Sequence, residues 1–254
     1  MACALLRWPV DGPATERLWL TQPARRTTPA VVTMVKGPRF VLDRGLFAPR
    51  SRTYRHPQPP DEGTMWRANG EKRRLAGVVE EKGLLWHRLE GVVPALGEKL
   101  TCHLDVERRE TTSRAHTALH LLLHALGPGG PRLVADPEVK GGGTIRLTLA
   151  PKPDPRARVG EALARVKALI AEDRPITPLA VPRDLARHRL MPQPFVPDDP
   201  FPGPPDLLHG VEIAGVGALP CDGVHVTRTS GVHEVSLVSL QTGGAGAVLL
   251  LRAR

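Results

Sequence analysis

Runs of apolar residues divide the chain into a strand-rich first part and a mixed second part. Two short apolar runs, Ala30–Val35 and Arg39–Leu42, are separated by a Gly37-Pro38 turn and predict a pair of strands. A second pair of runs in RLAGVVEEKGLLWHRLEG, with a turn near Lys82-Gly83, predicts two more strands. Residues 1–99 are therefore expected to form a small β-barrel or sandwich.

The pattern changes at about residue 100. Leucines recur at helical spacing in ERRETTSRAHTALHLLLHALG, and Gly127-Pro128 ends the predicted helix. RARVGEALARVKALIAEDRP predicts a second amphipathic helix, GGGTIRLTLAP a strand, and VEIAGVGALPCDGVHVTRTSGVHEVSLVSL a series of strands and turns. Seven prolines in MPQPFVPDDPFPGPP predict a loop. We expect an α+β chain with a first domain at residues 1–99 and a second at residues 100–254.

Composition adds a preference for an anionic partner. The 254 residues include 35 Lys and Arg against 26 Asp and Glu, a net charge of +9. A basic balance favours nucleic acid, because each neutralised phosphate releases counterions. The basic residues are spread along the chain, however, so a merely basic protein is the alternative reading.

Cysteine usage and apolar run lengths predict the compartment. Three cysteines, an odd and low number, argue against a disulfide scaffold and for a reducing environment. The apolar run at the start is too short for a signal peptide, and no run approaches the roughly 18 residues of a membrane span. A cytoplasmic protein without a membrane partner is expected.

Two histidine- and cysteine-containing pairs predict a metal site. His116 and His120 are four residues apart on the predicted helix, so both imidazoles lie on one face. Cys221 and His225 are four apart in a predicted loop, and Cys with His is an ordinary zinc set. Each pair alone is equally consistent with buried side chains that bind no metal. His124 lies another four residues along and is the competing ligand, but its place near the helix end favours a polar rim role.

The two pairs also have a recognisable setting. RRETTSRAHTALHLLLHAL, followed about a hundred residues later by LPCDGVHVTRTSG, resembles the editing domain of alanyl-tRNA synthetase and, more closely, the free-standing AlaX editing proteins. That family carries His-x3-His in an HTALH context and Cys-x3-His in a C-G-G-T-H-V context, from which this chain departs at Asp222 and Val224. LDVERR, VLDRGLF and QPPDEG resemble the family's I-D-W-x-R-R, V-L-D-x-T-x-F and G-G-G-Q-P-x-D-x-G. The resemblance spans about residues 30 to 250.

The resemblance implies a fold and an activity. The fold is an N-terminal β-barrel-like domain packed on an α/β editing domain with a largely antiparallel sheet. The activity is hydrolysis, in trans and without ATP, of the ester that joins serine or glycine to tRNA(Ala). One Zn²⁺ ion is the implied cofactor, aminoacylated tRNA the implied partner, and no DNA partner is expected. The implied metal ligands and catalytic residues are His116, His120, Cys221 and His225.

Four residues are expected to bind the substrate. The family's V-L-D-x-T-x-F threonine is Gly45 here, and Gln58 remains as an amide that could pair with the amino acid. Arg109 and Arg114, with Arg108 beside them, could hold the tRNA acceptor end through phosphates. The alternative reading of these arginines is a solvated helix start.

Other departures bear on specificity. The family's glycine triplet is replaced by PRSRTYRHP, whose basic run (Arg50, Arg52, Arg55, His56) could touch phosphate and whose Thr53 or Tyr54 could enter the pocket. Gly231 and His233 stand where the family's T-x-E-I-G has Glu and Gly. The predicted metal set is complete while the pocket set is altered. This predicts an editing hydrolase of changed specificity.

Two competing functions follow from the same residues. The first is a catalytically silent tRNA-binding protein whose zinc is structural, since four protein ligands form a closed site. The second is a zinc hydrolase of another small ester or amide. Catalysis would need one looser ligand, and His225 is the candidate because it follows a glycine-containing loop. Asp222, beside the site, is more simply a turn residue.

Overall fold

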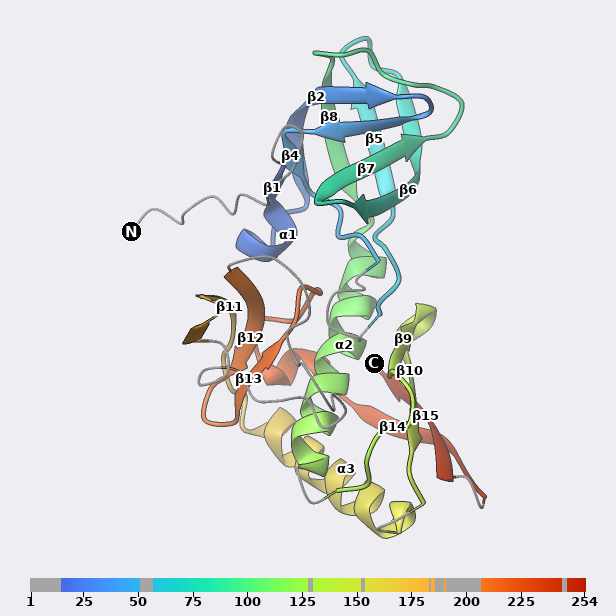
Figure 1. Ribbon diagram of the computed structural model, residues 1–254, viewed down its shortest axis with the longest axis vertical. Helices are drawn as coiled ribbons and strands as arrows, with labels where there is room; N and C mark the ends of the chain where they lie inside the picture. Colours follow the sequence, from blue (N-terminus) through green and yellow to red (C-terminus); the bar gives the residue numbers. More distant parts are fainter. Residues whose placement is uncertain are drawn as a thin grey trace. The chain divides into compact units, whose positions relative to one another are not determined.

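The chain folds into two compact units, which the computed structural model describes at residues 15–50, 57–127, 130–151, 154–182, 184–185, 190, 207–243 and 246–254 (Figure 1). The first unit comprises Met1–Arg50 and Pro59–Arg109, and the second Ser51–Gln58 and Glu110–Arg254. The domain boundary predicted after residue 99 falls inside a strand of the first unit, β8 (Lys99–Leu104). The predicted proline-rich loop, residues 192–205, lies outside the described residues.

Six strands of the first unit form a closed barrel in the order β2-β3-β7-β6-β5-β8. Their bounds are β2 Thr27–Lys36, β3 Arg39–Leu42, β5 Gly63–Arg67, β6 Lys72–Glu81, β7 Leu84–Leu89 and β8 Lys99–Leu104. Every pairing in this barrel is antiparallel. A short parallel pair, β1 (Glu16–Arg17) with β4 (Arg44–Gly45), and the one-turn helix α1 (Leu18–Thr21) complete the described part of the unit.

Turn residues explain why these strands pair as the sequence predicts. Gly37, between β2 and β3, has φ of 57°. Lys82 and Gly83, between β6 and β7, have φ of 51° and 77°. Two successive residues with positive φ match the tight turn that suits the twist of an antiparallel hairpin. Both hairpins predicted from the sequence are therefore confirmed.

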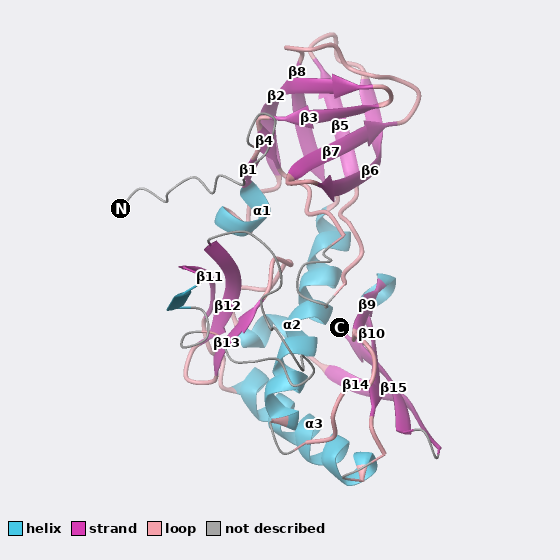
Figure 2. Cartoon of the chain, in the orientation of Figure 1, coloured by secondary structure: helices cyan, strands magenta, loops and turns pink. Residues whose placement is uncertain are grey.

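The second unit combines two long helices with two antiparallel sheets (Figure 2). The helices are α2 (Val106–Leu126), which begins in the first unit, and α3 (Pro155–Ala171). The four-stranded sheet has the order β14-β15-β10-β9, with bounds Val235–Gly243, Gly246–Ala253, Thr144–Leu149 and Glu138–Lys140. The three-stranded sheet has the order β11-β12-β13, with bounds Ile176–Pro182, Leu207–Ile213 and Gly217–Pro220. The described part of the unit also contains two short 3-10 turns, η1 (Gly141–Gly143) and η2 (Thr229–Val232). The predicted α+β class with largely antiparallel sheets is confirmed.

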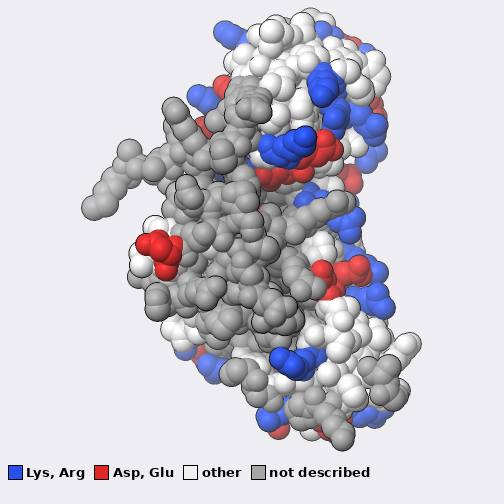
Figure 3. Space-filling model, viewed as in Figure 1, with Lys and Arg blue, Asp and Glu red and all other residues white. Residues whose placement is uncertain are grey.

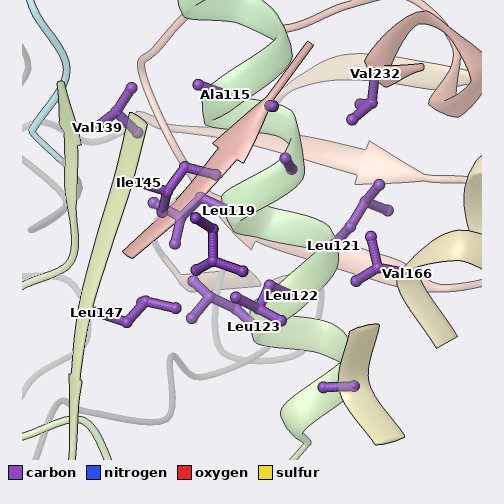
Figure 4. Close-up of a cluster of buried hydrophobic side chains, with 14 of the residues drawn as sticks. Ala115, Leu119, Leu121, Leu122, Leu123, Val139, Ile145, Leu147, Val166 and Val232 are labelled. Atoms are coloured by element: carbon purple, nitrogen blue, oxygen red, sulfur yellow. The ribbon is translucent and has the colours of Figure 1, made fainter. Parts of the chain in front are cut away.

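Helix α2 forms the centre of the second unit's hydrophobic core. Residues 115–123 are all buried, so the helix is enclosed on every side over this stretch. Leu119 points toward Ile145 of β10, whereas Leu121 points toward Val166 of α3 (Figure 4). Cys221 belongs to the same core cluster. Polar residues of this stretch therefore lie away from bulk water and need partners within the protein.

None of the described helices combines the length and the apolar character needed to cross a membrane. The longest, α2, has 21 residues, and Glu107, Arg108, Arg109 and Glu110 occupy its first turns.

Candidate metal centre

Helix α2 supplies two histidines that are completely buried. His116 and His120 are both 0% exposed, and their ring centroids lie 5.1 Å apart. A separation of four residues places both rings on one face of the helix, as the sequence predicts. Two adjacent imidazoles in an otherwise leucine-rich, buried stretch of helix are polar groups that could form a metal site.

The loop after β13 supplies the second pair. The backbone N–H of Cys221 donates to the carbonyl oxygen of His209 in β12 at 3.0 Å, which continues the sheet to the start of the loop. Cys221 is buried, and His225 is partly buried. The end of β13 thus places the Cys221 thiol in the interior. The loop that follows brings His225 close to this thiol.

The two pairs meet at one point. One ligand atom from each of His116, His120, Cys221 and His225 lies within 4.8 Å of the others, so this group could hold a metal ion. Cys221 Sγ is 3.6 Å from His116 Nε2 and 3.2 Å from His225 Nε2. The ring of His225 lies 4.7 Å from that of His116 and 4.6 Å from that of His120.

Gln58 connects the helix pair to the loop pair. Its side-chain oxygen Oε1 accepts a hydrogen bond from the backbone N–H of Val224 at 3.0 Å and lies 2.6 Å from His116 Nδ1. Gln58 is only 1% exposed. The sequence predicts this residue as a substrate contact. In the structure, its side-chain oxygen lies within hydrogen-bonding distance of the candidate ligand His116.

Thr117 makes the corresponding connection from the helix. Its hydroxyl accepts a hydrogen bond from the backbone N–H of Val226 at 3.2 Å and lies 3.2 Å from His225 Nδ1. Thr117 is 0% exposed. The sequence reading missed this residue. The available signal was a hydroxyl residue directly after His116 in the most buried part of a predicted helix.

Gly223 leaves the space that the centre needs. A Cβ at this position would overlap Cε1 and Nδ1 of His116 and lie 2.7 Å from Gln58 Oε1. The backbone N–H of Gly223 also donates to Cys221 Sγ at 3.3 Å. Position 223 therefore requires a glycine. The imidazole of His116 and the amide of Gln58 lie too close for a Cβ, and both are held in place by hydrogen bonds.

Burial governs the electrostatics of the centre. It raises the pKa of the Cys221 thiol well above its usual range, and the nearby Asp222 carboxylate acts in the same direction. A metal that bound the sulfur would therefore release this proton. Burial lowers the pKa of His124 to about 4, so that ring is neutral near pH 7. His124 is outside the four residues that the fold brings together.

Arg109 has a different contact set from the one expected. Arg109 is 5% exposed, and its guanidinium binds Asp61, with Nε 2.9 Å and 3.0 Å from the two carboxylate oxygens and Nη2 also in contact. Nη2 donates to the carbonyl oxygen of Leu46 at 2.9 Å. This is a buried ion pair within the first unit, whereas the sequence predicts a phosphate contact. Arg114 pairs loosely with Glu110 at 3.4 Å, and its side chain is 26% exposed.

Gly45 is packed inside the first unit. A Cβ there would lie 2.6 Å from Leu85 Cδ2 and 3.1 Å from both Thr15 Cγ2 and Trp19 Cζ3. There is no room for the threonine that the related motif carries at this position. The hydroxyl of the neighbouring Thr15 donates to the carbonyl oxygen of Leu42 at 2.7 Å.

Other predicted residues are divided between described and undescribed parts of the chain. Arg50 is exposed, whereas Arg52, Thr53, Tyr54, Arg55 and His56 lie outside the described residues. His233, which follows η2, has φ of 60° and ψ of −70°. A positive φ favours glycine, the residue that the related motif has here, so His233 adopts a conformation that a side chain disfavours.

The geometry thus defines a class: an α+β protein with a buried His3Cys cluster that could hold one metal ion. No protein-family model matches the chain. The chain is 27% identical over 236 residues to the "Alanyl-tRNA editing protein AlaX-M" of Methanosarcina barkeri, an alignment that covers 91% of this chain and 95% of that protein.

Alanine–tRNA ligases are similar over shorter parts of their length. The ligase of Korarchaeum cryptofilum is 29% identical over 242 residues, 89% of this chain and 24% of the ligase. That of Methanopyrus kandleri is 39% identical over 85 residues, 34% of this chain and 9% of the ligase. The chain therefore spans about a quarter or less of the length of these ligases. The resemblance stated from the sequence is confirmed: the chain is similar over most of its length to an AlaX-type alanyl-tRNA editing protein.

Proposed function

We propose that this chain is a zinc-dependent hydrolase that deacylates mischarged aminoacyl-tRNA in trans, with Ser-tRNA(Ala) or Gly-tRNA(Ala) as substrate. The proposed zinc ligands are His116, His120, Cys221 and His225. The observation that carries the proposal is this four-residue cluster in a chain similar to AlaX-M over 91% of its length.

The donor set and its spacing suit zinc. Imidazole nitrogen and thiolate sulfur are ordinary zinc ligands, at about 2.0–2.1 Å and 2.3 Å from the ion. Around a tetrahedral ion those bond lengths put sulfur and nitrogen about 3.5 Å apart. The separations of 3.6 Å and 3.2 Å from Cys221 Sγ to the two Nε2 atoms bracket that value.

The residues divide into fixed and accessible ligands. Zinc held there would supply a Lewis acid toward the ester carbonyl or toward water. His116, His120 and Cys221 are buried and would hold the ion from the interior. His225 alone of the four is partly exposed, so it lies on the side from which a substrate would approach. The proposal therefore keeps His225 as the looser ligand.

The proposed substrate is aminoacylated tRNA. The relatives named above act, by their names, on alanyl-tRNA or join alanine to tRNA. The net charge of +9 suits a polyanion, although Lys and Arg side chains lie next to Asp and Glu side chains on the face shown in Figure 3. Arg114 is the proposed phosphate contact on α2, since its loose pairing with Glu110 leaves it able to turn. The other predicted contacts were Gly45, Gln58 and Arg109. Gly45 packs inside the first unit, Gln58 lies against His116, and Arg109 binds Asp61.

Metal analysis and deacylation assays together test the proposal. The purified chain should hold about one zinc ion, and His116→Ala or Cys221→Ala should remove most of it and most of the activity on Ser-tRNA(Ala). His124→Ala is the matched control, a helix histidine outside the cluster, and should keep both. Full zinc in the His116 and Cys221 variants would exclude this ligand set.

The same assays separate the competing functions. A panel of mischarged tRNAs that the zinc-loaded protein binds but leaves intact would replace the hydrolase by a tRNA-binding protein with structural zinc. Binding should weaken steeply with salt if phosphates are contacted. The absence of any tRNA affinity at low salt would leave only a hydrolase of another ester or amide.

A further inference from the structure

The hydrogen bonds around Gln58 determine which nitrogen of His116 carries its proton. A backbone N–H only donates, so the Gln58 atom that lies 3.0 Å from the Val224 nitrogen must be the amide oxygen. The same oxygen lies 2.6 Å from His116 Nδ1. An oxygen of this kind only accepts, and therefore Nδ1 must carry the hydrogen. Nε2 then carries the lone pair, and it lies 3.6 Å from Cys221 Sγ.

The hydroxyl of Thr117 constrains His225 less strictly. It accepts one hydrogen bond from the Val226 backbone N–H and still has one hydrogen and one lone pair. At 3.2 Å, His225 Nδ1 can therefore either donate to this hydroxyl or accept from it. His225 is also the partly exposed member of the cluster. Gln58 fixes the ring of His116 in one tautomer, whereas Thr117 supports His225 in either tautomer.

We propose that Gln58 and Thr117 are positioning residues that orient the two ligands His116 and His225 for the metal. Gln58 joins the helix ligand to the loop through Val224, and Thr117 joins the loop ligand to the helix through Val226. This inference rests on the proposed function, because it assigns work to residues around the proposed metal. It also removes the oxygen of Gln58 from the recognition of the amino acid, since both of its hydrogen bonds are made within the protein.

The tautomer itself is the most direct test, and it needs no substitution. Nitrogen-15 spectra of the labelled imidazoles, assigned with single His→Gln variants, report which ring nitrogen is protonated. His116 should carry its proton on Nδ1 both before and after zinc is added. A proton on Nε2 of His116 in the zinc-free chain would overturn the assignment to Gln58.

Zinc affinity, measured by competition with a chelator, gives the second test. Gln58→Met keeps the side-chain length and removes the acceptor, and it should weaken zinc binding by about 10- to 100-fold, the usual range for an outer partner of a metal ligand. Gln58→Glu keeps an acceptor for both Val224 and His116 and should bind zinc within about threefold of the unaltered chain.

Thr117 offers an equally matched pair. Thr117→Val keeps the shape and removes the hydroxyl, whereas Thr117→Ser keeps the hydroxyl and should bind zinc as the unaltered chain does. The loss in Thr117→Val should be smaller than in Gln58→Met, because the partly exposed His225 can turn to hydrogen-bond water, whereas the fully buried His116 cannot. The visible spectrum of the cobalt-substituted proteins should change in the same order.

The outcomes separate this inference from the proposed function. A Gln58→Met chain that binds zinc within about threefold of normal, or a greater loss in Thr117→Val, would overturn the positioning roles and leave the metal centre in place. A chain that binds no zinc at all would overturn the proposed function, and this inference with it. A weakened Gln58→Met variant beside a normal Gln58→Glu variant would support both.

Discussion

A methyl group at position 223 would fall on the ring of His116, because Gly223 lies directly against that imidazole. Gly223→Ala should therefore weaken zinc binding and lower the free energy of unfolding by about 1–3 kcal/mol, the usual cost of an overpacked core. Chelator competition and thermal melting measure the two effects. The ring cannot move aside without breaking its hydrogen bond to Gln58.

Gly160 in α3 is the matched control for this substitution. A Cβ there meets no atom within 4 Å, and the residue is exposed in a helix. Gly160→Ala should stabilise the chain by about 0.5–1 kcal/mol and leave zinc binding unchanged. If the two alanine variants behaved alike, close approach at Gly223 would not be the reason for its glycine.

Arg109 and Arg114, five residues apart on α2, are predicted to respond differently to loss of charge. Arg109→Met leaves the buried Asp61 carboxylate without its partner and should cost about 3–5 kcal/mol of stability. Arg114→Met should leave the melting temperature nearly unchanged and should reduce the salt dependence of tRNA binding by about one phosphate contact. The reverse pattern, with a stable Arg109 variant that loses tRNA affinity, would restore the phosphate role predicted from the sequence.

The sequence could predict ligands but not their neighbours. His116 and His120 are recognisable because a helix fixes their spacing, and the loop motif supplies Cys221. The partner of Arg109 lies 48 residues earlier in the chain, at Asp61, and no local pattern encodes such a distance. Thr117 was missed for the same reason, since its partners His225 and Val226 are 108 and 109 residues away.

At the scale of elements, periodicity located the hairpins and helices but missed strands without a clear pattern. The β2–β3 and β6–β7 pairs have turn residues with positive φ between alternating strands, and these are strong local signals. Strand β11 contains Pro178 and Pro182, which argue against a strand in sequence reasoning. Strand β8 directly precedes α2, so its residues were assigned to the helical part and the predicted boundary cut the barrel.

The barrel contains an acid-sensitive group, His87 of β7. It is 0% exposed and stacks on Phe40, with ring centroids 5.7 Å apart. Burial lowers its pKa to about 4, from an ordinary value near 6.5. Between these pH values the unfolded chain binds a proton that the folded chain excludes. Stability is therefore present in full above pH 6.5 and is lost as the pH falls toward 4.

His87→Leu should remove this contribution. Relative to the unaltered chain, the variant should gain up to about 3 kcal/mol of stability when the pH is lowered from 7 to 4, a figure that follows from the size of the pKa shift. Denaturant titrations at a series of pH values measure it. A stability difference between the two chains that stayed constant across this range would show that His87 is protonated to the same extent in folded and unfolded states.

At the scale of the whole molecule, the candidate centre is assembled from segments that are far apart in sequence. Gln58, the middle of α2 and the loop from Cys221 to Val226 contribute to it, and all belong to the second unit. Pro57 and Gln58 thus belong to the unit that holds the centre, although the residues that follow, Pro59–Arg109, belong to the first unit. A division into two consecutive domains could not predict this arrangement, because local patterns carry no information about which unit a short segment joins.

The packing and hydrogen bonds of these residues lead to a prediction about how well the chain distinguishes serine from alanine on tRNA(Ala). A site that hydrogen-bonds a substrate hydroxyl rejects the analogue that lacks it by about 10⁴-fold or more, whereas a site that reads size alone reaches only about 10- to 200-fold. Gly45 has no hydroxyl and no space for one, and the hydroxyl of Thr15 is bonded to the backbone of Leu42. The oxygen of Gln58 is bonded to His116 and Val224. We therefore expect deacylation of Ser-tRNA(Ala) to exceed that of Ala-tRNA(Ala) by only about 10- to 200-fold.

Rates of deacylation on the two charged tRNAs, measured with the same enzyme preparation, give this ratio directly. Gly45→Thr cannot serve as the gain-of-selectivity variant, because its side chain would clash with Leu85 in the first unit. Thr53→Val and Tyr54→Phe are the informative changes, since both remove a hydroxyl from the segment that replaces the family's glycine triplet. A ratio above about 10³ in the unaltered chain that falls in one of these variants would contradict the expected modest selectivity and identify the hydroxyl that reads serine.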